Sequence, residues 1–302
     1  MGRPSASNLN GILVIDKPAG WTSHDVVAKA RGITRQRRIG HTGTLDPMAT
    51  GVLVLCLGQA TRLVEYMIRH EKRYVGEITL GVATDTDDAE GEVLSRKPPP
   101  SLTQQRLRSI ESAFTGDLLQ RPPAYSAIKV DGKRSYARAR GGEAVELPLR
   151  PVVIREISMS VVEPDRLRLQ VRCGPGTYIR SIARDIGELL GCGAHLSSLR
   201  RTSVGAFTLS DAITLEALAS AVENGRLEER LRQADEGVGG LAAAVLALSQ
   251  VVLLRHGASV QTTDLAANSA DVARIYDAAG SFAGLGSVAE TGEIRGLKLL
   301  NL

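Results

Sequence analysis

The chain has 302 residues, of which 43% are hydrophobic and 3% aromatic, and its formal net charge is +4 at pH 7. This size allows one large domain and a small one, and the mild positive charge permits nucleic-acid binding without indicating it. Three widely spaced cysteines and a polar N-terminus exclude the common zinc spacings, a disulfide framework and a secretory signal, which predicts a cytoplasmic protein.

The first predicted elements are a strand, a helix and a second strand. Residues 11–15 form a short apolar run, as expected of a strand. Thr22 and Asp25 have the spacing of a capping box, which predicts a helix that begins there and ends at Gly32. Residues 52–57 form a second, entirely apolar run and therefore predict another strand.

A glycine-rich loop with a single acidic residue precedes this second strand. Residues 40–51 (GHTGTLDPMATG) place Asp46 among three glycines. Pro47 biases Asp46 away from helical geometry, so we expect its carboxylate on an extended segment. A carboxylate presented in this way is either a nucleophile or general base, or an ordinary turn aspartate. The spacing alone leaves both alternatives open.

The middle of the chain alternates between strands and helices. Residues 74–80 have the alternation of a half-buried strand, residues 103–114 predict a helix, and residues 167–173 predict another strand. Thr177 is the expected cap of a following helix with one apolar stripe. Residues 120–150 have no regular period and are rich in basic residues, which is typical of a functional insertion. These elements predict a mixed sheet with helices packed on it.

The end of the chain has a different pattern. Residues 238–254 form the longest uncharged run, are too short to span a membrane, and predict a buried helix and a linker. Short strands are expected at residues 273–277, 282–288 and 294–300, with turns between them. This pattern predicts a small β-barrel.

Several blocks of the sequence resemble the TruB family of bacterial tRNA pseudouridine synthases. They occur in the order found in that family and extend over roughly two thirds of the chain, which makes the resemblance specific. The blocks are residues 11–23 (GILVIDKPAGWTS), 40–51, 72–74 (KRY), 84–91 (TDTDDAEG), 121–129 (RPPAYSAIK), 176–180 (GTYIR), 192–196 (CGAHL) and 199–202 (LRRT).

The resemblance implies an α+β fold in two domains. Residues 1–236 would form the pseudouridine synthase domain, with a mixed, largely antiparallel sheet flanked by helices. The segment at about residues 120–150 would be a thumb insertion that clamps RNA. Residues 248–302 would form a small PUA-like β-barrel that binds RNA, although the resemblance is weaker there.

The implied activity is isomerisation of uridine to pseudouridine at position 55 in the T-loop of tRNA. Asp46 matches the catalytic aspartate of the family, and Arg180 matches the arginine that pairs with it and keeps it ionised. Tyr74 matches the residue placed against the flipped uracil, where its hydroxyl would assist proton transfer. Without the resemblance, Arg180 reads as a surface arginine and Tyr74 as a core aromatic residue of a strand.

Other residues are implied to bind the RNA. Tyr178 and Leu199 would line the base pocket, and His41 would fill the gap that the flipped base leaves. Three basic runs flank the proposed site, and we expect them to contact phosphates, although charge runs are usually solvated faces. The runs include Arg38, Lys129, and the pair Arg200 and Arg201.

The remaining expectations concern ligands and partners. Residues 85–91 begin like a calcium loop but lack its final glutamate. The resemblance implies that they form a surface turn that touches RNA. No metal or cofactor is expected, and His41 has no second ligand at metal-binding spacing. The expected partner is the T-stem-loop of tRNA, bound by a monomer without a guide RNA or a membrane. The alternatives are a non-catalytic RNA-binding or tRNA-folding protein on the same scaffold, and the guide-RNA-dependent branch of the superfamily.

Overall fold

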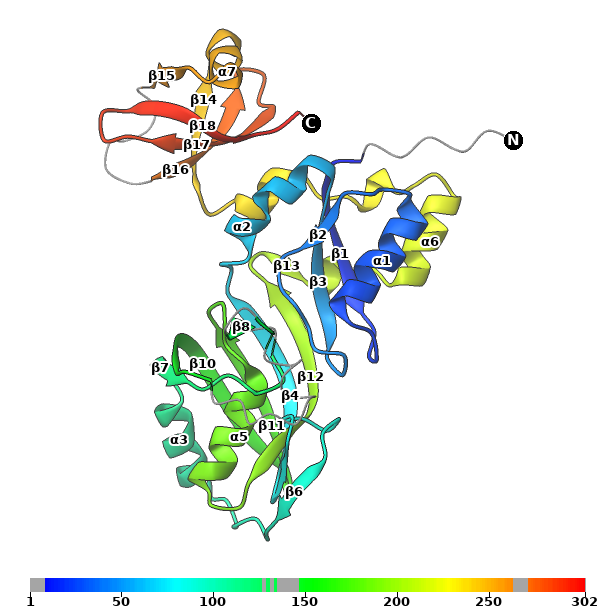
Figure 1. Ribbon diagram of the computed structural model, residues 1–302, viewed down its shortest axis with the longest axis vertical. Coiled ribbons are helices and arrows are strands. Elements are labelled where there is room, and N and C mark those ends of the chain that lie inside the picture. Colours follow the sequence, from blue (N-terminus) through cyan, green and yellow to red (C-terminus); the bar gives the residue numbers. More distant parts are fainter. Residues whose placement is uncertain (1–8, 127–128, 131–132, 135–146, 263–270, 302) are drawn as a thin grey trace.

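The computed structural model describes residues 9–126, 129–130, 133–134, 147–262 and 271–301 (Figure 1). Its main feature is a sheet with the strand order β1–β3–β12–β4–β11–β10–β7, in which β13 pairs with β12 and β2 with β3. Only β3 and β12 run parallel, so the expected mixed, largely antiparallel sheet is confirmed. The strands are β1 (Gly11–Lys17), β2 (Ile39–His41), β3 (Thr50–Leu57), β4 (Lys72–Leu80), β7 (Gly116–Gln120), β10 (Arg150–Glu163), β11 (Arg166–Cys173), β12 (Ala194–Val204) and β13 (Phe207–Thr208).

Helices cover the two halves of this sheet separately (Figure 1). Helices α1 (Ser23–Thr34) and α6 (Leu215–Glu223) pack against the apolar side chains of β1 and β3. Helices α3 (Gln104–Ala113) and α5 (Ile179–Leu189) pack against β4, β10 and β11. The predicted capping box at the start of α1 is present, because Thr22 and Asp25 hydrogen-bond each other's main-chain amides.

The start of α5 differs from the expected helix cap. Thr177 donates its hydroxyl to the carbonyl of Gly174 at 3.1 Å, so the hydroxyl stabilises the preceding turn instead of the helix. Tyr178 is the N-cap, and no side chain caps the helix there. The side-chain amide of Gln120 instead holds the main chain of Tyr178, at 2.8 Å to its nitrogen and 3.0 Å to its oxygen.

The parallel pair β3–β12 joins the two halves of the sheet through only two residue pairs. Thr50 lies opposite Arg200, and Gly51 lies opposite Arg201. Gly51 has φ = +98°, and a Cβ atom there would lie 2.2 Å from the carbonyl oxygen of Arg201. Both the backbone conformation and the lack of space therefore require glycine at this junction.

We expect Gly51→Ala to destabilise the fold by about 3–5 kcal/mol, since it combines an unfavourable φ with a main-chain clash. Gly20→Ala is the matched control, because Gly20 also has a positive φ of +78° but has open space at its Cβ position. The control should cost only about 1–2 kcal/mol. Urea unfolding of both variants measures the difference, and equal losses would contradict the steric argument.

The C-terminal part forms a second, curled five-stranded sheet with the order β14–β16–β17–β18–β15, a half-barrel consistent with a PUA-like domain. The three expected strands are confirmed as β16 (Val272–Asp277), β17 (Phe282–Val288) and β18 (Glu293–Leu299). Its other elements are β14 (Ala242–Leu246), α7 (Leu248–Arg255) and β15 (Ser259–Gln261). A buried helix and a linker were expected at residues 238–254, and the structure has a helix, α7, only in the last part of this segment. The segment also contains β14, which was not expected, and α7 buries Val251 and Leu254 but leaves Leu248, Val252 and Leu253 exposed.

This half-barrel packs on the first part of the chain beside α2 (Val64–Met67) (Figure 1). Leu285 and Leu300 share an apolar cluster with Ile12 and Met67. Lys298 forms an ion pair of 2.7 Å with Glu65 at the same contact. In the part of the chain that the structure describes, no helix is long and apolar enough to cross a membrane.

Candidate active site

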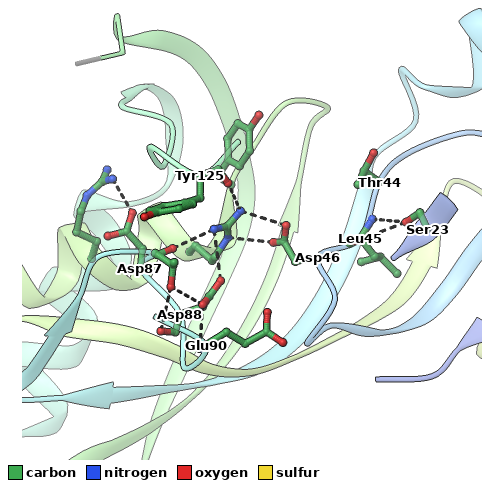
Figure 2. A network of polar contacts seen from close by, with 12 residues as sticks. Ser23, Thr44, Leu45, Asp46, Asp87, Asp88, Glu90 and Tyr125 are labelled. Atoms are coloured by element: carbon green, nitrogen blue, oxygen red, sulfur yellow. Dashed lines mark hydrogen bonds and ion pairs between the residues drawn. The ribbon is translucent and has the colours of Figure 1, made fainter. Parts of the chain in front are cut away.

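Asp46 lies in a loop, residues 42–49, that connects β2 to β3 and is called here the Asp46 loop. On one side of Asp46, the main-chain nitrogen of Leu45 donates to the hydroxyl of Ser23 at 2.8 Å (Figure 2). On the other side, the carbonyl of Pro47 accepts a hydrogen bond of 2.8 Å from the nitrogen of Gly20. The side chain of Asp46 is 33% exposed. Its carboxylate is therefore partly accessible, while hydrogen bonds hold the main chain of Leu45 and Pro47 on either side.

Lys17 supports this loop from inside the protein. Its side chain is fully buried, and Nζ donates to the carbonyls of Trp21 at 2.6 Å, Pro18 at 2.9 Å and Pro47 at 3.1 Å. Burial lowers the pKa of Lys17 to about 8, although the negative charge of Asp46 favours the protonated form. No pattern in the sequence predicted a role for this lysine.

We expect wild-type protein to gain stability relative to Lys17→Met between pH 8 and 10.5. The folded-state pKa of Lys17, about 8, lies below its ordinary value of 10.5, so in this window the unfolded chain binds more protons than the folded protein. Stability that depends on Lys17 therefore rises with pH. Urea unfolding of both proteins at several pH values measures the effect, and parallel pH profiles would contradict it.

Arg180 lies in the first turn of α5, and its guanidinium faces Asp46 across the site. Nη2 donates to Oδ1 of Asp46 at 3.1 Å, and Nε lies 3.0 Å from Oδ2. The structure therefore brings together the two residues that the sequence analysis paired. A two-point contact of this kind fixes the orientation of a carboxylate as well as its position.

The guanidinium of Arg180 has further partners from two other segments (Figure 2). Nη1 donates to the carbonyl of Thr86 at 2.9 Å and lies 3.3 Å from Oδ2 of Asp88. Nη2 also donates to the carbonyl of Tyr125 at 3.0 Å. Arg180 is 5% exposed and Asp88 4%, so this guanidinium is held between one buried and one partly exposed carboxylate.

Arg184 repeats this arrangement one helical turn further along α5. It forms an ion pair of 2.9 Å with Asp87 and donates to the carbonyl of Arg121 at 2.8 Å. Burial raises the pKa of Asp87 to about 6, while Arg184 opposes the shift. The expectation that residues 85–91 form a surface turn is therefore wrong at its centre, because Asp87 and Asp88 are buried against arginines of α5.

Tyr74 and Leu199 lie on neighbouring strands close to Asp46. Tyr74 is 9% and Leu199 7% exposed, and both belong to the apolar cluster that contains Leu45. Burial raises the pKa of the Tyr74 phenol. Tyr178 is half-buried at the start of α5, where burial likewise raises its pKa. The core position of Tyr74 that its alternating pattern indicates is thus real, and the same residue lies next to the candidate site.

The expected RNA-binding residues differ in their surroundings. Arg38 is exposed, and His41 is half-buried, which lowers its pKa. The side chain of Lys129 lies outside the described residues. Arg200 forms an ion pair of 2.7 Å with Asp16, so a phosphate would have to share or replace that partner.

Arg201 corrects the expectation of phosphate contact in the third basic run. It is 1% exposed and belongs to the protein interior. Its three hydrogen bonds to main-chain carbonyls, at 2.7–3.3 Å, hold the guanidinium inside the protein. A phosphate at the protein surface cannot reach it.

Comparison with known proteins agrees with this geometry. The family description "TruB family pseudouridylate synthase (N terminal domain)" matches residues 31–179, and two C-terminal descriptions of the same family match residues 180–239 and 242–300. The tRNA pseudouridine synthase B of Xanthomonas campestris pv. campestris (strain B100) is 43% identical over 294 residues, which cover 97% of this chain and 94% of that protein. The chain belongs to the TruB family of pseudouridine synthases.

Other TruB-family relatives and one solved structure agree. The tRNA pseudouridine synthase B of Stutzerimonas stutzeri (strain A1501) is 41% identical over 97% of this chain and 96% of that protein. That of Arthrobacter sp. (strain FB24) is 50% identical over 71% of this chain and 72% of that protein. A chain in the crystal structure of a Cbf5-Nop10-Gar1 complex superposes with a TM-score of 0.74 and 28% identity, covering 93% of this chain and 79% of that one. The TruB-family chain is an RNA-modifying isomerase with a pseudouridine synthase fold.

Proposed function

We propose that this TruB-family enzyme converts uridine 55 in the T-loop of tRNA to pseudouridine, with Asp46 as the nucleophile. The contact between Asp46 and Arg180 carries the proposal. It joins a partly exposed carboxylate to a buried guanidinium, next to an aromatic and an aliphatic side chain that suit a flipped base. A turn aspartate without chemistry would not need a buried arginine of this kind.

The reaction exchanges one bond between the base and the sugar for another. The bond from N1 of uracil to C1′ of ribose breaks, a bond from C5 to C1′ forms, C5 loses a proton and N1 gains one. Asp46 would attack either the sugar or the base, and Arg180 would keep its carboxylate ionised and aligned. The enforced geometry then holds the detached uracil while it turns.

The other residues would bind the RNA. Tyr74 would stack on the flipped uracil and assist proton transfer, with Tyr178 and Leu199 closing the pocket and His41 filling the gap in the RNA. The residues proposed to contact phosphates are Arg38, Lys129 and Arg200. We also propose that residues 120–150 clamp the T-stem-loop, that residues 248–302 bind RNA, and that the enzyme acts as a cytoplasmic monomer without a guide RNA.

Tritium release from tRNA labelled at C5 of uridine tests this function. Purified enzyme, with no guide RNA added, should release tritium from the wild-type transcript and from an isolated T-stem-loop. It should release none from a transcript with cytidine at position 55. Equal release from the cytidine transcript would place the reaction elsewhere. Tight binding without release from any transcript would identify a non-catalytic RNA-binding protein.

A further inference from the structure

Arg201 is a buried cation that lies against the Asp46 loop. Its Nε donates to the carbonyl of Val52 at 2.7 Å, on the strand that follows the Asp46 loop. Nη2 donates to the carbonyl of Gly43 at 3.0 Å and Nη1 to that of Thr44 at 3.3 Å. The guanidinium therefore fixes the main chain on both sides of Asp46.

The charge of Arg201 reaches much of the site. Burying a cation is costly unless its surroundings compensate the charge. The three carbonyls that accept hydrogen bonds from Arg201 are neutral, so they do not cancel its positive charge. Arg180 and Arg184, in contrast, both contact carboxylates. The positive charge of Arg201 contributes to lowering the pKa values of Lys17, His41 and Lys72. Such a charge favours negative charge that develops nearby.

Arg201 also lies beside Tyr74 in the sheet. The two residues lie opposite each other on the antiparallel strands β12 and β4. Opposite residues of an antiparallel pair share one face of the sheet, and both side chains are buried there. Burial raises the pKa of the Tyr74 phenol, and the positive charge of Arg201 opposes this shift. A guanidinium can only donate, so a hydrogen bond from Arg201 to Tyr74 would occupy a lone pair of the phenol oxygen. The phenolic proton then remains available to another acceptor.

We propose that Arg201 is a positioning residue of the reaction, which holds the Asp46 loop and directs the hydroxyl proton of Tyr74 toward the substrate base. Tyr74 then acts on the base as a hydrogen-bond donor. The proposal rests on the proposed function, because it assigns Tyr74 to the uracil pocket. It adds a residue, a direction for the hydrogen bond, and a link between the nucleophile loop and the base.

A double-mutant cycle tests the link. We expect Arg201→Lys to lower kcat by about 100-fold with KM within about threefold, because a lysine cannot hold three carbonyls and the phenol together. In the Tyr74→Phe background the same substitution should cost at least about tenfold less. Arg166→Lys is the control, since Arg166 lies on β11 with carboxylate partners and should keep wild-type kcat. Independent, multiplicative losses in the cycle would overturn the proposal.

A spectroscopic measurement reads the contact without activity. 3-Fluorotyrosine at position 74, whose phenol is more acidic than that of tyrosine, is titrated by fluorine NMR in wild type, Arg201→Lys and Arg201→Gln. We expect the midpoint to rise in every variant that folds, because the guanidinium donor to the phenolate is lost. An unchanged midpoint would overturn the proposal.

Two further readouts remain decisive if both arginine variants unfold. With arginine labelled by nitrogen-15, Tyr74→Phe should shift one buried guanidinium resonance and Tyr66→Phe should not. The absence of such a shift would overturn the contact. An inactive wild type with a normal Tyr74→Phe shift would reject the proposed function while leaving the contact intact.

Discussion

Asp46→Asn should abolish pseudouridine formation, with a loss in kcat of about 10⁴-fold or more, while tRNA affinity stays within about threefold. The amide has nearly the shape of the carboxylate, so it can still accept a hydrogen bond from Arg180. It lacks the negative charge and the nucleophilicity that the proposed chemistry needs. Tritium release under single-turnover conditions measures the chemical step, and filter binding measures the affinity.

A second aspartate gives the matched control. Asp165 lies in the exposed turn between β10 and β11, and its main-chain carbonyl, which Asn retains, accepts a hydrogen bond from Leu80. Asp165→Asn should therefore behave as wild type in both assays. Full activity of Asp46→Asn would make Asp46 a turn residue. An equal loss in affinity and rate would make it a binding residue.

Arg180→Lys should lower kcat by about 10³-fold with little change in KM. A lysine keeps the charge but cannot hold both oxygens of Asp46 together with the carbonyls of Thr86 and Tyr125. The carboxylate would remain ionised yet lose its fixed direction. Single-turnover kinetics measure the loss, which should be similar at every pH where the wild type is active.

Arg172 provides the control for this substitution. It also contacts two carboxylates, at 2.9 Å to Glu71 and 2.7 Å to Glu156, but on β11 with its side chain 29% exposed. Arg172→Lys should change kcat by less than about twofold, since exposed ion pairs contribute little. If the two lysine variants lost activity equally, the orientation of Asp46 by Arg180 would not be the cause.

Local patterns predicted much of the fold. The capping box of Thr22 and Asp25, the alternation along β4 and the turns that separate β16 to β18 each depend on residues close in sequence. Thr177 shows the limit of this approach. Its hydroxyl could accept a hydrogen bond from the first turn of the helix or donate one to the carbonyl of Gly174, and the sequence does not decide between these two bonds.

The site was predicted less completely, because its partners are far apart in the chain. Asp88 looked like a turn residue, yet it is buried because Arg180 arrives from a helix some ninety residues later. Arg201 looked like part of a basic surface, but it is buried against carbonyls of the Asp46 loop, which lies far away in the sequence and leads into the neighbouring strand β3. Two arginines spaced by four on one helix, with a double aspartate elsewhere, were the available signal for Asp87 and Asp88.

The parallel pairing of β3 with β12 affects when the site can form during synthesis of the chain. Gly51 and Arg201 meet there, although 150 residues separate them in sequence. At about 5–20 residues per second, the ribosome needs roughly 8–30 seconds between making one and the other. Through that interval the Asp46 loop lacks its hydrogen bonds from Arg201, and β3 lacks its neighbouring strand β12. With Asp46 as the proposed nucleophile, we expect a growing polypeptide of this enzyme to modify RNA only after most of its first domain has been synthesised.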